Sequence, residues 1–108
     1  MSSVCIAVSR QKATPQGLME ALGDPTWEWT HSKADSAIPC GLAPGDVQTA
    51  GWGDASACCR IYIHADGFCI AAPLDVKKDR AYAAQVAAKL GMAPVVDEGK
   101  AVSRNKEV

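Results

Sequence analysis

Hydrophobic and polar residues alternate most clearly between residues 57 and 72, a pattern that predicts two antiparallel strands joined by a tight turn. Asp66-Gly67 is typical of a two-residue type I′ turn, and it predicts that Ala65 pairs with Phe68. In that register one face of the hairpin is apolar and the other is mixed. The apolar face holds Ile61, Ile63, Ala65, Phe68, Ile70 and Ala72, and the mixed face holds Arg60, Tyr62, His64 and Cys69.

Two helices are predicted by apolar residues at helical spacing between residues with capping propensity. The first covers residues 15–22, with Thr14 as N-cap, proline at the first helical position and Gly23 as the stop. The second covers residues 76–90, with Asp75 as N-cap and Gly91 as the left-handed residue after its end. We expect its inward face to comprise Ala83, Val86, Ala87 and Leu90, with Tyr82 beside them and Met92 packing onto the C-cap.

The other segments predict shorter or less regular structure. Residues 4–9 and 26–31 read as strands, and in the second both tryptophans, Trp27 and Trp29, share a face with His31. Residues 32–56 are rich in Gly, Pro, Asp, Ala and Ser, which predicts a long loop with at most a short strand at 47–50. Residues 93–96 read as an edge strand that begins beside a proline.

These elements predict a single α+β domain over residues 1–96, followed by a frayed, charged C-terminal tail over 97–108. The domain is an antiparallel β-sheet of four or five strands, built on the hairpin, with two helices. The chain has 108 residues, 48% hydrophobic and 21% charged, which suits one domain with one core.

Cysteine usage and hydropathy predict a cytoplasmic protein. The five cysteines are odd in number and irregularly spaced, which favours buried thiols in a reducing compartment over a disulfide scaffold. Apolar runs stay well below the roughly 18 residues that span a bilayer, and the N-terminus does not read as a signal peptide. No membrane contact is therefore expected.

Charge is distributed unevenly along the chain. Residues 13–59 contain six acids, among them Asp35, Asp46 and Asp54, against the single Lys33. This acidic middle section could face a protein partner with a basic surface, although a solvated loop is the commoner explanation of such a charge distribution. Nucleic-acid binding is not expected, because no basic stripe with interleaved aromatic residues is present.

The predicted hairpin contains one candidate catalytic pair, His64 and Cys69. In the predicted register His64 lies opposite Cys69, and an imidazole beside a thiol can generate a nucleophilic thiolate. The alternative is a chance pairing, since no oxyanion hole or orienting third group can be identified around Cys69.

No metal or cofactor is expected. Cys58 and Cys59 are adjacent on a strand and therefore point to opposite faces, and no metal-ligand spacing occurs elsewhere. The glycine-rich passages match neither phosphate-binding motif. Trp52, between two glycines, is either a core residue or an exposed anchor for a partner.

In type only, the chain resembles small bacterial or phage inhibitors such as toxin-neutralising immunity proteins and anti-defence proteins. That resemblance implies a binding protein that inhibits a macromolecular partner by occlusion. The acidic middle section and the loop around Trp52 predict its contact residues: Trp52, Asp46, Asp54 and Asp35. The alternative is a small-molecule or peptide binder, with a thiol site at Cys69 and His64.

Overall fold

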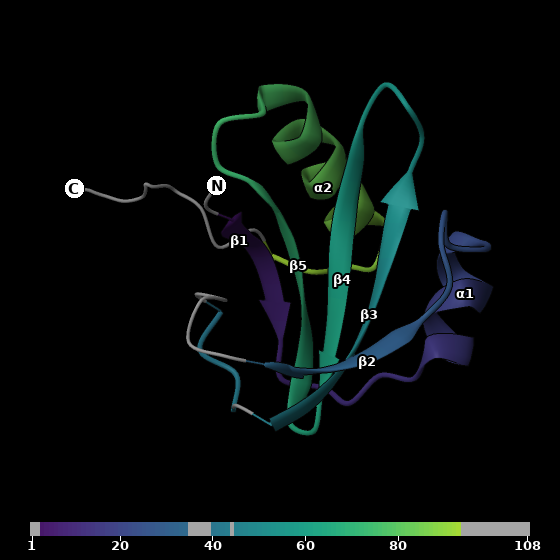
Figure 1. Ribbon diagram of the computed structural model, residues 1–108, viewed down its shortest axis with the longest axis vertical. Helices are drawn as coiled ribbons and strands as arrows, with labels where there is room; N and C mark the ends of the chain where they lie inside the picture. Colours follow the sequence, from purple (N-terminus) through teal and green to yellow (C-terminus); the bar gives the residue numbers. More distant parts are fainter. Residues whose placement is uncertain (1–2, 35–39, 44, 94–108) are drawn as a thin grey trace.

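The computed structural model describes residues 3–34, 40–43 and 45–93, which form one antiparallel sheet with two helices (Figure 1). The strands are β1 (Ser3–Ser9), β2 (Thr30–Ala34), β3 (Gly45–Gly53), β4 (Cys58–His64) and β5 (Gly67–Pro73). They lie in the order β1-β5-β4-β3-β2, so β2 to β5 form a meander and β1 pairs with β5. The predicted α+β fold with four or five antiparallel strands is confirmed.

Both helices lie on one face of the sheet, and the core lies between them and the strands. Helix α2 (Lys77–Lys89) contacts β5, β4 and β1, and α1 (Pro15–Leu22) contacts α2. The buried side of α2 is Ala83, Val86 and Ala87, with Leu90, Tyr82 and Met92 packed at its margin, as predicted. Small alanines on the helix let its backbone approach the sheet closely.

The two faces of the hairpin are as predicted, but its register is different. Ile63 pairs with Phe68 and His64 with Gly67, so the turn residues are Ala65 and Asp66. Gly67 is the first residue of β5, and only glycine fits there because a Cβ would lie 2.1 Å from the carbonyl oxygen of Ser9. The shift moves each partner by two residues, which preserves the faces.

The helix ends follow the predicted caps with one exception. The Thr14 hydroxyl accepts the N–H of Gly17 at 3.1 Å, and Gly91 has a φ of 72° after α2. The N–H of Met92 donates to the carbonyl of Ala87, which closes the C-terminal turn. The predicted cap Asp75 is wrong: α2 begins at Lys77, so Val76 occupies the N-cap and makes no side-chain bond.

The short strand expected at 47–50 is present but longer, since residues 45–53 form the nine-residue strand β3, and the predicted long loop is wrong there. β3 pairs with β4 along one edge and with β2 along the other. Its small residues resemble loop composition, but Ala50 and Gly51 are buried in the middle of the sheet. The glycine-rich composition of this segment therefore concealed most of an interior strand of the sheet.

The predicted strand at 26–31 is also corrected, since β2 begins only at Thr30. Ahead of it, the Thr26 N–H donates to the carbonyl of Gly51 at 2.7 Å, so the chain follows the edge of β3 in a bent path. The bend puts the two tryptophans on opposite faces. Trp29 meets Trp52 edge-to-face at 5.3 Å in the core, whereas Trp27 lies over Gly51 on the helix-free face.

The remaining sequence predictions concern segments beyond the described residues. The tail from 97 and the edge strand at 94–96 lie outside them, and Ala93 is not in a strand. Within the described residues, neither helix has the length and hydropathy to cross a bilayer.

Candidate functional site

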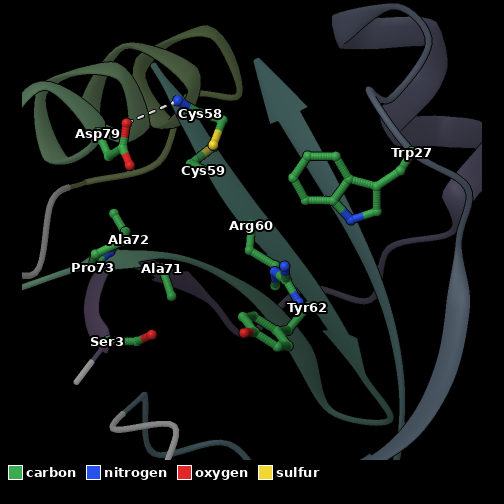
Figure 2. A pocket seen from close by; sticks show the side chains of 10 residues that line it. All are labelled: Ser3, Trp27, Cys58, Cys59, Arg60, Tyr62, Ala71, Ala72, Pro73 and Asp79. Atoms are coloured by element: carbon green, nitrogen blue, oxygen red, sulfur yellow. Dashed lines mark hydrogen bonds between the residues drawn. The ribbon is translucent and has the colours of Figure 1, made fainter. Parts of the chain in front are cut away.

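The helix-free face of the sheet is divided into two halves. The half near the β4–β5 turn is covered by residues 40–43, which we call the cover segment. The other half carries a groove in front of β4 (Figure 2). The half near the turn contains His64 and Cys69, which the sequence marked as candidates for catalysis.

A disulfide between Cys5 of β1 and Cys40 attaches the cover segment to the sheet. The expectation of five thiols is therefore wrong for this pair, which are 35 residues apart in sequence but have Cα atoms 5.4 Å apart. Sequence spacing does not reveal such a contact. Cys58, Cys59 and Cys69 are free, and the cytoplasmic location stays a prediction.

Side chains from the hairpin hold the other end of the cover segment. Nδ1 of His64 lies 3.2 Å from the carbonyl oxygen of Ala43, which accepts its hydrogen. The Asp66 carboxylate accepts the N–H of Ala43 at 3.3 Å and also lies 3.7 Å from the Arg10 guanidinium. His64 is only 7% exposed, so its contacts indicate a structural role.

The geometry gives no support to a thiol nucleophile at Cys69. Tyr62, not His64, lies opposite Cys69 in the observed register. The Cys69 side chain is fully buried beside the disulfide, and this burial raises its pKa to about 12. An activated cysteine needs the opposite shift, toward a pKa near neutrality.

The groove has a volume of about 250 Å³. Cys58, Arg60 and Tyr62 follow one another along β4 on its floor, because alternate residues of a strand share a face. Trp27 forms the wall of the groove on the β3 side. The opposite wall is formed by small residues of β5 and β1, among them Ala71 and Ser3.

Trp27 is held in place by a glycine and an arginine. A Cβ on Gly51 would lie 1.8 Å from the Trp27 ring, so the indole occupies the space that any side chain at 51 would need. The central carbon of the Arg60 guanidinium lies 5.5 Å from the ring centroid, a cation–π contact. Trp27 nevertheless stays 39% exposed, which leaves much of its surface for other contacts.

Asp79, in the first turn of α2, closes the end of the groove beside Cys58. Its carboxylate accepts the backbone N–H of Cys58 at 3.0 Å and thereby joins the helix to β4 (Figure 2). Burial raises the pKa of the Cys58 thiol, the Asp79 charge raises it further, and the Arg60 charge opposes both. The neutral thiol is therefore favoured.

The residues predicted to bind a partner do not form one surface. Trp52 is 4% exposed and belongs to the core, so its reading as an exposed anchor is wrong. Asp46 and Asp54 lie near opposite ends of β3, eight residues and therefore about 27 Å apart. Asp35 lies outside the described residues.

Asp54 also has a local structural role. Its carboxylate accepts the backbone N–H and hydroxyl of Ser56 and the N–H of Ala57, which orders the β3–β4 turn. These bonds, led by the Ser56 hydroxyl, hold its pKa below the ordinary value. An exposed acid in such a turn is explained without a partner.

Trp27 and Arg60 are the prominent surface residues that the sequence did not select. Arg60 was placed on the correct face, but Trp27 was assigned to the face of Trp29.

Comparison with protein-family models, curated proteins and solved structures finds no match. Among the described residues, no three His, Cys, Asp or Glu side chains are arranged to hold a metal ion.

The cysteine assignments predict an ordered pattern of alkylation. At about pH 8, a thiol whose pKa is about 12 is thiolate in only about one molecule in ten thousand, so Cys59 and Cys69 should resist iodoacetamide in the folded protein. Cys58, partly exposed, should react first. Unfolding without reductant should expose three thiols, and reduction should add Cys5 and Cys40, as peptide mass spectrometry would show.

Fast labelling of Cys69 at about pH 7, lost in His64→Ala, would contradict the assignment and restore the thiol-site hypothesis.

The packing of Trp27 on Gly51 predicts a strongly non-additive pair of substitutions. Gly51→Ala should lower the free energy of unfolding by about 1–3 kcal/mol, because the new methyl displaces the indole. In a Trp27→Ala background the same change should cost nothing, since alanine suits a strand better than glycine. Urea unfolding of the four proteins measures this coupling, and equal costs in both backgrounds would show that the ring does not lie there.

Proposed function

We propose that this protein is a small binding protein that inhibits a macromolecular partner by occlusion, with the groove and Trp27 as its contact surface. The observation that carries the proposal is an exposed tryptophan held beside an arginine on a face without helices. Tryptophan, tyrosine and arginine are the residues that contribute most often to binding energy at protein interfaces.

The rigidity of Trp27 favours binding. A side chain that is fixed before contact loses little conformational entropy when a partner covers it. Gly51 provides the space for the indole, and the Arg60 guanidinium lies over the ring from β4. The surface is therefore pre-organised in the free protein.

The size of the groove favours a macromolecule over a free small ligand. Ligand pockets in proteins usually measure about 300–1,000 Å³ and enclose most of the ligand. The groove, at about 250 Å³ and open on one side, fits one or two side chains of a partner. A peptide or small-molecule binder remains the second candidate, because the same floor would accept an extended peptide.

The chemistry of the groove favours binding over catalysis. Cys58 is the partly exposed thiol of the groove, and both burial and the Asp79 charge raise the pKa of that thiol. A carboxylate beside a thiol opposes thiolate formation, whereas a catalytic cysteine needs a neighbour that promotes it.

The proposal predicts which substitutions abolish partner capture. Immobilised protein should retain a specific partner from an extract of its native cells, identified by mass spectrometry. Trp27→Ala and Arg60→Ala should each weaken capture at least about tenfold, which corresponds to the loss of one interface hot spot. Arg10→Ala and Asp46→Lys are matched surface controls, and circular dichroism would confirm that all variants fold.

Capture that survives Trp27→Ala and Arg60→Ala but is lost in Asp46→Lys would reject this surface in favour of the acidic section. Retention of a small molecule instead of a protein, detected by native mass spectrometry, would favour the second candidate.

A further inference from the structure

We infer that the groove is a carboxylate-binding site, in which Arg60 receives an acidic side chain of the partner while Trp27 packs against that side chain's apolar atoms. This inference rests on the proposed function and names the chemistry that the groove recognises. It depends on the two charged residues of the groove, Arg60 and Asp79, which have different roles.

Asp79 is already used by the fold. Its carboxylate accepts the Cys58 N–H, and its place in the first turn of α2 puts it beside the positive end of the helix dipole. It therefore has both a hydrogen-bond donor and a favourable field within the protein. The position of the Asp79 carboxylate in the groove is therefore explained without a cationic group from a partner.

Arg60 has no such acidic partner. In the described part of the chain, no carboxylate lies within 4.0 Å of its guanidinium, whereas Arg10 pairs with Asp66 at 3.7 Å. The central carbon of the Arg60 guanidinium lies over the Trp27 ring at 5.5 Å from its centroid, and Arg60 is exposed, so its N–H groups can reach an acceptor from outside. A guanidinium presents its N–H groups as a planar fork, which can form two parallel hydrogen bonds to a carboxylate.

The arrangement of charges sets the orientation of the occupant. Asp79 closes the end of the groove beside Cys58, and Arg60 lies one strand repeat away along β4. A carboxylate would be repelled at the Asp79 end and attracted at Arg60. The groove is partly open, so a side chain of the partner can enter it from solvent.

The volume sets the size of the occupant. About 250 Å³ holds a carboxylate together with several carbon atoms, and the exposed Trp27 ring provides the apolar contact beside it. Glutamate and aspartate next to an apolar residue match this combination. A bare inorganic anion would satisfy the charge but leave the ring uncovered.

Benzoate tests the site without the partner, because it combines a carboxylate with an apolar ring. Titration followed by two-dimensional ¹H–¹⁵N NMR should shift the Trp27 indole N–H and the Arg60 Nε–H signals saturably, with a Kd in the millimolar range. Benzamide, of the same shape but uncharged, should bind at least about tenfold more weakly. Inorganic phosphate should also bind more weakly than benzoate, because it does not cover the ring.

The variants separate a carboxylate receptor from general positive charge. Arg60→Gln should abolish the benzoate shifts at Trp27, and Arg60→Lys should lose most of the affinity because an ammonium lacks the planar fork. Arg10→Gln, which removes the same charge at an arginine already paired with Asp66, should leave the titration unchanged. Equal binding of benzamide or phosphate, or full affinity in Arg60→Lys, would overturn the carboxylate site.

The two proposals can fail separately. Loss of partner capture in Trp27→Ala, together with absent benzoate binding, would retain the contact surface and reject the carboxylate site. Benzoate binding with capture unaffected by Trp27→Ala and Arg60→Ala would reject the contact surface and keep the site.

Discussion

The structure depends on how the second face of its sheet is covered. Both helices lie on one face, so the residues buried on the opposite face, such as Cys5 and Cys69, are shielded from water by other segments. Near the β4–β5 turn the cover segment does so, fixed by the disulfide to Cys5 and by His64. At the other end, Trp27 lies on Gly51 and shields β3 while leaving the groove open.

Local patterns predicted the elements whose cause is local. The first helix, the caps Thr14 and Gly91, and both faces of the hairpin follow from hydrophobic spacing and backbone preference. Only the short strand at 47–50 was expected of the nine-residue strand β3, because its glycines resemble loop composition. In the fold, the Trp27 ring occupies the space that a side chain at Gly51 would need. The turn lies at Ala65-Asp66, and Gly67 lies close to the Ser9 backbone, a contact between distant segments that the local pattern does not contain.

The candidate site was harder to predict, since it depends on contacts between distant segments. Sequence pattern placed Arg60 and Tyr62 on the correct face, but nothing local indicates that Trp27 stacks there. The same reason concealed the disulfide, whose cysteines meet only after β1 and the cover segment are placed. Trp52 was conspicuous between glycines, yet those glycines accompany a buried strand rather than an exposed loop.

The central claim is that Trp27 lies flat on Gly51 and thereby forms one side of the groove. The most direct measurement is the proton NMR spectrum of Gly51, because protons beneath an aromatic ring experience its ring current. The account predicts Gly51 α-proton signals well upfield of their random-coil position, with nuclear Overhauser contacts to the Trp27 indole, and both lost in Trp27→Ala. Random-coil shifts for Gly51 in the folded protein, with no contact to the indole, would contradict the account.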